Sequence, residues 1–214
     1  MLRSGAMAGE ASTTGRASAP RKAFDEPYYR RFYGDPRTRV ADPASCAALA
    51  GFVFAYLELL RIPVRRVLDI GCGIGLWRRE VLRHHPAARY VGVEKSDYAC
   101  REHGWEKGCV TSYQAEEPFD LVICQGVLPY LEDTEVEVAL HNLARLAKPA
   151  LYLEVLTVED WERNCNRQVT DGRVYLRSAT WYRERLRRDF LACGGGLFLA
   201  RNAPVVLFEL EHLA

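Results

Sequence analysis

Short apolar runs alternate with longer amphipathic stretches through the middle of the chain. The apolar runs cover residues 66–70, 90–93, 109–111, 121–124 and 150–155. Each run is too short for a core helix and is bounded by Gly, Pro or charge, which is typical of buried parallel strands. Apolar residues recur at helical spacing over residues 76–84, 98–105 and 134–146. Strands alternating with helices predict a doubly wound α/β fold with a mostly parallel sheet.

The pattern differs at both ends of the chain. Tyrosines and Phe32 predict a short aromatic helix near residues 28–33, before the breaker Gly34-Asp35-Pro36. A second helix can be capped by Asp42 or Ser45 and run to Leu60. Its apolar residues at helical spacing are Leu49, Phe52, Tyr56 and Leu59 or Leu60. At the other end we expect a helix over residues 180–192 and an antiparallel hairpin from the runs 197–200 and 205–210. The hairpin brings the sheet to seven strands.

These elements predict one domain over residues 25–214, preceded by a disordered tail over residues 1–24. Its parts are N-terminal helices at 25–61, a core at 65–155, a polar segment at 157–178, and the helix and hairpin at 180–214. The polar segment is longer than most connections in compact domains, and such segments are usually functional or disordered. The first residues lack the apolar region of a secretory signal, and no run approaches the ~20 residues that span a membrane.

The composition of the chain limits the classes of partner that it is expected to bind. The chain is 49% hydrophobic and 27% charged, with a net charge of +1. Such a balance indicates a globular protein with no overall attraction to nucleic acid or anionic membranes, so we expect a small-molecule or protein partner and a monomer or homodimer. The seven cysteines contain no Cys-x-x-Cys pair, which favours reduced thiols and a cytoplasmic location. No His, Cys, Asp or Glu cluster has metal-ligand spacing, and we expect no metal.

The strongest chemical signal is the segment VLDIGCGIG at residues 67–75, a strand that runs into a glycine-rich turn and then a helix. Gly71 and Gly73 allow the backbone to approach a ligand, and the helix that begins near Leu76 presents free N–H groups. Glu94 ends the second strand, where a βαβ unit places an acid that can accept hydrogen bonds from both ribose hydroxyls.

This segment resembles motif I of the class I (Rossmann-like) S-adenosylmethionine-dependent methyltransferases. Residues 118–131 are similar to the family's fourth strand and following loop, and the resemblance covers residues 65–155. It implies S-adenosyl-L-methionine as cofactor. The cofactor-binding residues that it implies are Asp69, Gly71, Cys72, Gly73, Gly75, Glu94, Lys95, Cys124, Gln125 and Gly126. Many members carry an adenine-binding Asp after the third strand; here Thr111 and Ser112 stand there, and either a hydroxyl replaces the Asp or Glu116 folds back.

The methyl acceptor is expected beside the cofactor, beyond the carboxyl ends of the strands. Candidate acceptor-binding residues are Tyr28, Tyr29, Tyr33, Trp161, Arg173 and Tyr175. The tyrosines could instead pack the first helix against the sheet. Arg163, Arg167, Arg173 and Arg177 either form a solvated face or hold a carboxylate or phosphate. Glu154 and Tyr130 are the candidate catalytic residues, as proton acceptors.

The resemblance predicts in-line methyl transfer to an O or N nucleophile. A small molecule is the first choice of acceptor, a protein side chain the second, and a nucleic acid is disfavoured by the neutral charge. A nicotinamide-dependent oxidoreductase would need a third glycine at position 76, which is Leu76. A non-catalytic module that keeps the fold as a scaffold is the remaining alternative.

Overall fold

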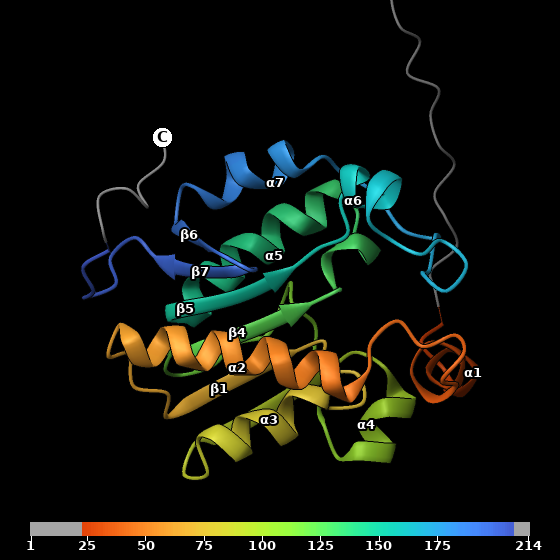
Figure 1. Cartoon of the computed structure of the whole chain (residues 1–214), viewed down its shortest axis with the longest axis horizontal. Helices are drawn as coiled ribbons and strands as arrows, with labels where there is room; N and C mark the ends of the chain where they lie inside the picture. The colour runs from red at the N-terminus through yellow and green to blue at the C-terminus, as the bar shows by residue number, and fades with distance from the viewer. Residues whose placement is uncertain (1–22, 208–214) are drawn as a thin grey trace, which may run out of the picture.

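A seven-stranded sheet forms the centre of the computed structural model, which describes residues 23–207 (Figure 1). The strands are β1 (Arg66–Ile70), β2 (Arg89–Glu94), β3 (Glu106–Lys107), β4 (Phe119–Gln125), β5 (Ala147–Glu154), β6 (Phe190–Gly194) and β7 (Leu197–Ala200). Their order is β3-β2-β1-β4-β5-β7-β6. The first five are parallel, and β7 runs antiparallel to both β5 and β6. The predicted fold class, with its mostly parallel seven-stranded sheet and C-terminal antiparallel pair, is confirmed.

Helices cover both faces of this sheet (Figure 1). They are α1 (Glu26–Tyr29), α2 (Pro43–Leu59), α3 (Leu76–His84), α4 (Asp97–His103), α5 (Asp133–Leu146), α6 (Val158–Arg163) and α7 (Ala179–Leu186), with a π-helix η1 (Arg30–Gly34) and a 3-10 helix η2 (Leu128–Tyr130). Residues of α2 and α3 form one hydrophobic cluster with the sheet, and residues of α5 and α7 form the other. The sheet is therefore the middle of three layers.

Side chains alternate between the two clusters along each central strand. Val67 and Ile123 pack with α2 and α3, whereas Leu68, Val122 and Cys124 pack with α5 and α7. This follows from the two-residue repeat of a strand. Because both faces are buried, the strands are continuous apolar runs in the sequence.

The long helix α2 begins as the sequence indicates but buries another face. Asp42 caps it by accepting hydrogen bonds from the backbone N–H groups of Ala44 and Ser45. Phe52 and Leu59, taken from their spacing as part of the apolar face, are 42% and 71% exposed. The buried residues are Cys46, Ala50, Val53, Phe54 and Leu57. Because α2 is apolar on nearly all sides, its spacing does not identify the face that meets the sheet.

The third strand is displaced from its predicted position. We expected it at residues 109–111, but β3 is the two-residue segment Glu106–Lys107, which pairs with Val93 and Glu94 of β2. Both β3 residues are exposed at the sheet edge, while Val110 is only 2% exposed and belongs to the following turn. The apolar character of residues 109–111 therefore predicted a strand where the chain forms a buried turn. The polar strand at the sheet edge, β3, was not predicted.

The C-terminal hairpin also uses different residues. Helix α7 ends at Leu186, and residues 190–192 at the end of the predicted helix belong to β6 instead. Gly194, Gly195 and Gly196, all with positive φ, form the turn between β6 and β7. Residues 205–207 of the predicted last strand are not in a strand, and residues 208–210 lie outside the described part.

The N-terminal boundary moves by at least one residue. Residues 1–22 of the predicted tail lie outside the described part of the chain. Phe24 packs edge-to-face on both Tyr28 and Tyr130, and its backbone oxygen accepts a hydrogen bond from Ser96. The ordered region thus includes Phe24.

A buried arginine fixes the polar segment 157–178 to the sheet layers. The ends of the segment meet, since Val158 N donates to the backbone oxygen of Arg177. The Arg177 side chain is buried, and it donates to a carboxylate oxygen of Asp133 and to the backbone oxygens of Leu131 and Tyr175. Arg177 is therefore a structural anchor of the segment and not a member of a solvated face.

We predict that Arg177→Met lowers the free energy of unfolding by about 2–4 kcal/mol, because it leaves two carbonyl groups and a carboxylate without their charged donor. A chemical denaturation curve measures the change. Arg188→Met removes an exposed arginine nearby and is the control, with an expected change within about 0.5 kcal/mol. Equal stability of the two variants would contradict the anchoring role.

Candidate cofactor and acceptor site

The candidate site lies where the order of the parallel strands reverses. The chain passes from β1 outward to β2 on one side, and from β4 outward to β5 on the other. Ligands of open α/β sheets bind at this point, beyond the carboxyl ends of the strands. The loops after β1 and β4 touch there, because a Cβ on Gly71 would lie 2.2 Å from the Val127 side chain. Only a glycine lets the two loops approach so closely.

The end of β2 holds the glycine loop in place. The N–H groups of Gly71 and Cys72 both donate to the backbone oxygen of Val93, at 2.7 and 3.2 Å. Gly73 N donates to Glu94 Oε2 at 3.0 Å. The loop and the second strand are therefore one hydrogen-bonded unit.

Glu94 is a buried acid, 6% exposed. Its Oε1 accepts from the backbone N–H groups of Lys95 and Ser96, at 2.7 and 3.1 Å. With Gly73 N on Oε2, three backbone donors fix the orientation of the carboxylate. A carboxylate held in this way presents its remaining lone pairs in a defined direction.

Asp69 is the second buried acid and is 3% exposed. Burial is the main reason that its pKa is raised to about 7; a hydrogen bond from the Tyr90 hydroxyl lowers the pKa, and the nearby charge of Glu94 raises it. That bond is 2.6 Å long. Tyr90 is a partner that the sequence motif does not reveal.

Trp105 is another residue that the sequence analysis missed. Its Nε1 donates to the backbone oxygen of Gly73 at 2.9 Å. A Cβ on Gly75 or Gly92 would lie 2.5 Å from its ring. A glycine inside a strand often marks the close approach of another group. Gly92 could therefore have indicated in the sequence that a bulky side chain packs on β2. Gly75 borders this ring and a separate surface hollow, not the cavities described next.

Two adjoining cavities open at the site. The larger has a volume of about 460 Å³ and is lined by residues that include Asp69, Cys72, Gln125 and Glu154. The smaller, of about 60 Å³, lies beside Glu94 and Lys95 and the turn 108–110. Lining residues common to both are Tyr28, Tyr33, Gly71, Gly73, Gln125, Gly126 and Tyr130. The cavities together form one cleft.

The tyrosines of α1 and η1 cover this cleft. Tyr28 and Tyr33 line both cavities, and Tyr29 lines the smaller one and stacks on Tyr98. The hydroxyls of Tyr28 and Tyr130 are 3.1 Å apart. Burial raises the pKa of Tyr28, Tyr29 and Tyr33, so these phenols are neutral near pH 7. The sequence left open whether these tyrosines line the acceptor site or pack the first helix. In the structure they do both, since they pack against one another and line the cleft.

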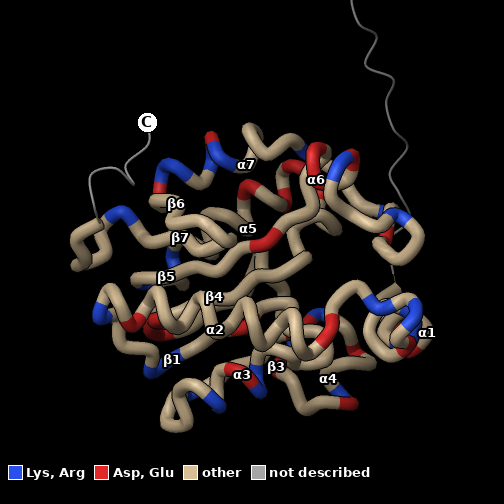
Figure 2. The backbone as a smooth tube through the Cα atoms, in the orientation of Figure 1, with Lys and Arg blue, Asp and Glu red and all other residues tan. Residues whose placement is uncertain are grey.

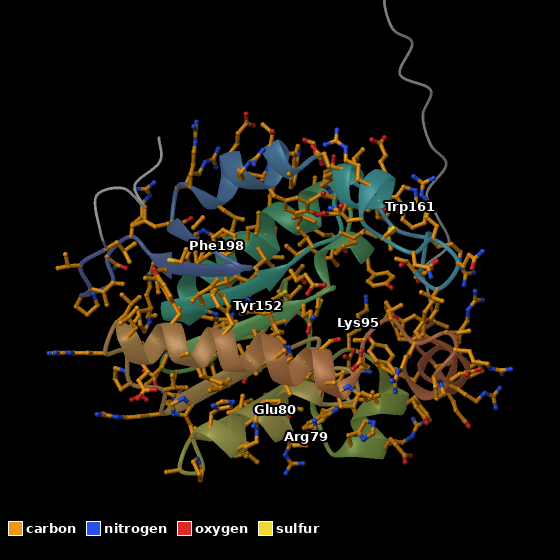
Figure 3. All side chains as sticks on the ribbon, in the orientation of Figure 1. Arg79, Glu80, Lys95, Tyr152, Trp161 and Phe198 are labelled. Carbon is orange, nitrogen blue, oxygen red and sulfur yellow. The ribbon has the colours of Figure 1, made fainter. Side chains whose placement is uncertain are left out.

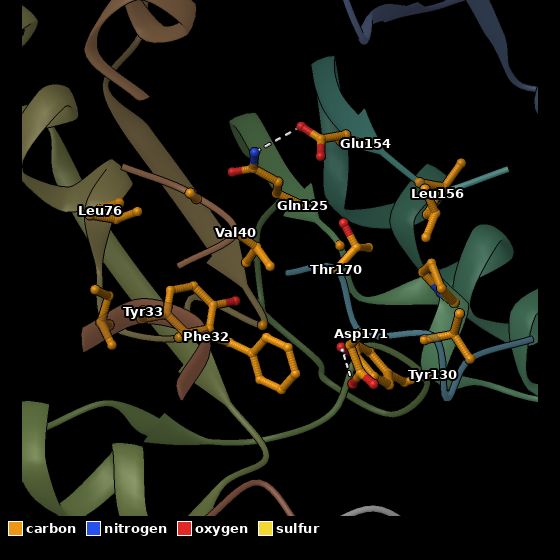
Figure 4. Close-up of a pocket in the computed structure, with 18 of the residues that line it drawn as sticks. Phe32, Tyr33, Val40, Leu76, Gln125, Tyr130, Glu154, Leu156, Thr170 and Asp171 are labelled. Atoms are coloured by element: carbon orange, nitrogen blue, oxygen red, sulfur yellow. Dashed lines mark hydrogen bonds between the residues drawn. The ribbon is translucent and has the colours of Figure 1, made fainter. Parts of the chain in front are cut away.

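A row of hydrogen bonds crosses the ends of α3, β4 and β5. Trp77 Nε1 donates to Gln125 Oε1 at 2.8 Å, and Gln125 Nε2 donates to Glu154 Oε2 at 2.8 Å, the second of which is drawn in Figure 4. Tyr152 Oη donates to the same oxygen at 3.1 Å. Glu154 is exposed to the cavity, while Tyr152 is buried beside the sheet (Figure 3). The row therefore fixes the direction of the Glu154 carboxylate.

The segment 157–178 supplies the opposite wall of the cavity, as expected, but not through the three candidates Trp161, Arg173 and Tyr175. Asp160, Thr170 and Asp171 line the larger cavity, and Tyr130 Oη donates to Asp171 Oδ2 at 3.1 Å (Figure 4). The predicted residues Trp161, Arg173 and Tyr175 do not line it. Trp161 stands on α6 against Gly172 (Figure 3). The Arg173 side chain is 78% exposed, and Tyr175 Oη donates to Glu132.

Three candidate cofactor contacts lie away from the cleft. Thr111 and Ser112 follow the displaced β3, and Ser112 N donates to the backbone oxygen of Cys109 in a turn. Gly108, Cys109 and Val110 take their place beside the smaller cavity. Cys124 is 0% exposed in the α5 cluster, because strand alternation turns it away from the neighbouring Gln125.

The described residues contain neither a metal-binding cluster nor a helix that could span a membrane. Between residues 23 and 207, no group of three or more His, Cys, Asp or Glu side chains is placed to hold a metal ion. Over the same range, no helix is both long enough and apolar enough to cross a membrane.

The methyltransferase domain family matches residues 29–194 of the chain. The ubiquinone biosynthesis O-methyltransferase of Hahella chejuensis is 32% identical over 114 residues, which cover 47% of this chain and 46% of that protein. Nodulation protein S of Rhizobium tropici is 29% identical over 120 residues, covering 52% and 50%. The chain spans about half the length of these curated relatives.

A solved structure shares the fold. The N-methyltransferase NodS of Bradyrhizobium japonicum, in complex with S-adenosyl-L-homocysteine, aligns with a TM-score of 0.54 at 16% identity and covers 82% of this chain and 97% of its own. The strand order, and the cleft at the point where that order reverses, are those of the class I methyltransferase fold. Since the family match extends over most of the chain, the protein belongs to the methyltransferase domain family, and the resemblance to class I methyltransferases is confirmed.

We predict that Gly73→Val abolishes binding of S-adenosylmethionine, because the new side chain would project towards Tyr29 and Tyr33 across the cleft. Isothermal calorimetry measures the affinity. Gly104→Val is the matched control, since Gly104 also has positive φ but has no atom within 4 Å of its Cβ position and lines neither cavity. Similar affinities of the two variants would contradict the placement of the cofactor.

Asp69→Asn should raise the melting temperature above that of the wild type, and more at pH 8 than at pH 5. The folded-state pKa of about 7 lies above the usual value of 3.8, so wild-type stability falls as pH rises between those values and then stays lower. Asparagine lacks this ionisation, and each kcal/mol gained corresponds to about 2–4 °C. Thermal melts at both pH values test the effect; the same difference at pH 5 and pH 8 would contradict it.

Proposed function

We propose that the protein is an S-adenosylmethionine-dependent methyltransferase that transfers the methyl group in line to an oxygen or nitrogen of a small molecule. The observation that supports this best is the hydrogen bond from Gly73 N to Glu94, which joins the glycine loop to the acid at the end of β2. The larger cavity adjoins Gly73, and its walls come from four separate stretches of the chain, residues 28–41, 69–77, 125–130 and 154–174. A concave site with aromatic and aliphatic walls and a few polar groups suits a small molecule.

The residues of the cleft fit the chemistry of the cofactor. Asp69 provides a carboxylate for the ammonium group, and Gly71 and Gly73 leave room for close approach of the methionine portion. Glu94 can accept the ribose hydroxyls with lone pairs that its backbone donors do not use. We assign the adenine to the turn 108–110. The cavity there holds only about 60 Å³, so the aromatic cover must shift outward when a nucleoside enters.

The relatives support methyl transfer to both kinds of nucleophile. The Hahella chejuensis relative is described as an O-methyltransferase, and NodS is described as an N-methyltransferase in complex with S-adenosyl-L-homocysteine. Because the chain matches about half of the first relative, the acceptor is inferred from the cavity of this chain.

When bound, S-adenosylmethionine supplies a methyl group on a positively charged sulfur, which is already a good leaving group. The chain's main task is then to orient the acceptor, which can contribute roughly 7–11 kcal/mol. Of the two candidate proton acceptors, Glu154 is the better one, since burial raises the pKa of Tyr130 and keeps it protonated. Tyr130 acts as a hydrogen-bond donor at the cavity wall, as it does towards Asp171.

We also propose a cytoplasmic location. All seven cysteines lie within the described residues, and the structure shows no disulfide among them. Reduced thiols are typical of the cytoplasm, where disulfides are rare.

We predict that Glu94→Ala weakens S-adenosylmethionine binding by about 2 kcal/mol, roughly 30-fold, because the ribose hydroxyls lose a charged acceptor. Glu94→Gln should lose less, since its amide oxygen still accepts. Calorimetry measures affinity, and a melting curve of each variant shows whether the loop has remained folded. Unchanged affinity in the folded alanine variant would exclude Glu94 as the ribose partner.

The activity itself is tested by incubating the full chain with cell extract and cofactor that carries an isotopically labelled methyl group. Mass spectrometry should detect a small product that gains the labelled methyl group. Cofactor binding without any labelled product would instead support the non-catalytic scaffold.

A further inference from the structure

The larger cavity carries charge of one sign. Its charged lining residues are Asp69, Glu154, Asp160 and Asp171, and no Lys, Arg or His is among the described residues that line it. The other walls are mainly aromatic and aliphatic, which raises the strength of electrostatic interactions inside. We propose that the acceptor is an amine that is protonated in solution, so that the reaction is an N-methylation. This inference rests on the proposed function, which gives Asp69 and the glycine loop to the cofactor and leaves the part of the larger cavity beside Glu154, Asp160 and Asp171 to the acceptor.

Glu154 is the side chain best placed to meet the ammonium group. Its Oε2 is held by two neutral donors, Gln125 Nε2 and Tyr152 Oη. Within residues 23–207, no hydrogen-bond donor contacts Oε1, and no cationic side chain pairs with the carboxylate. Because Glu154 is exposed at the cavity wall, its charge faces the bound molecule (Figure 4).

The acids of segment 157–178 add to the same potential. Hydrogen bonds from Thr157 and Asn164 lower the pKa of Asp160, which is therefore ionised at neutral pH. Asp171 accepts from Tyr130 Oη and from Arg173 N. The Arg173 Nε lies 4.0 Å from Asp171, so Asp171 has a cationic neighbour, and the negative potential of this part of the cavity comes mainly from Glu154 and Asp160. Figure 2 shows acidic positions at the end of β5 and both acidic and basic positions on α6.

Of the four arginines that could have held an anion, Arg167 and Arg177 are engaged elsewhere, and Arg163 and Arg173 are exposed and do not line the larger cavity. Arg177 is buried against Asp133 and two backbone oxygens. Arg167 lies over the Trp161 ring and donates to the backbone oxygens of Trp161 and Glu162. Lys95 is at the smaller cavity, with its Nζ over the Phe24 ring. Among residues 23–207, a carboxylate or phosphate on the acceptor would therefore meet carboxylates and no cation in the lining of the larger cavity.

The transfer step balances with these groups. The substrate ammonium gives one proton to Glu154 Oε1, which passes it to solvent. The nitrogen lone pair then forms the N–C bond to the methyl carbon while the C–S bond breaks, and its electron pair stays on sulfur. The product is a methylated ammonium ion, and S-adenosylhomocysteine leaves as a neutral thioether. Glu154 needs no covalent change, only a proton to accept and release.

Three probes that share a phenylethyl group and differ in the charge of their polar group test the proposal. The full chain, saturated with S-adenosylhomocysteine, is titrated with phenethylamine, phenethyl alcohol and 3-phenylpropionate, and binding is followed by ligand-observed NMR. We expect the ammonium to bind roughly fivefold to tenfold more tightly than the carboxylate, with the alcohol between them. In Glu154→Gln the preference should fall to about twofold, since one charge is removed while the Gln125 contact can persist.

Glu184→Gln is the matched control, because it removes the same charge from an exposed position of α7 that lines neither cavity. Its preference should equal that of the wild type. Equal affinity for the three probes, or tighter binding of the carboxylate, would overturn the proposal. A full preference retained in Glu154→Gln would overturn the role of that residue. Failure of S-adenosylhomocysteine to bind at all is a separate result, which would reject the proposed function before any probe is added.

Discussion

The hydrogen bonds between the end of β2 and the glycine loop are the constraint on which the site depends. Val93 and Glu94 accept from three successive loop N–H groups, those of Gly71, Cys72 and Gly73. Parallel pairing of β1 and β2 brings these groups to the same sheet edge. Once the loop is held there, Asp69 lies at its start, Trp105 packs behind it, and the loop after β4 packs against Gly71. Glu94 therefore holds the glycine loop in place and also lines the smaller cavity of the cleft.

The parts of this arrangement that the sequence predicted are those fixed by short-range chemistry. The glycine-rich turn, the strand before it and the helix after it follow from local backbone requirements, and β1 and α3 have the bounds that the pattern indicated. The position of Glu94 follows from the covalent length of one βαβ unit. The acid-to-loop contact thus needed no knowledge of distant pairing.

The parts that the sequence did not predict depend on long-range partners. Edge strand β3 is polar, and only its pairing with β2 defines it, so residues 108–110 border the smaller cavity in place of Thr111 and Ser112. Residues 190–192 suit a helix locally, but β7 pairs with them as a strand. The bonds from Tyr90 to Asp69 and from Trp77 to Gln125 join side chains far apart in the sequence, and no spacing rule indicates them.

The charge of the cleft also bears on turnover. On the proposed function, Asp69, Glu94 and Glu154 surround a cofactor that enters with a positive sulfur and leaves as a neutral thioether. Because Coulomb attraction is stronger in a poorly solvated cleft, these acids favour the reactant form of the cofactor over its product form. The ionised form of Asp69 lowers the stability of the fold, as its raised pKa indicates. Its presence in the cleft is then explained by what the charge does to the ligand, since an uncharged lining would bind both forms of the cofactor alike.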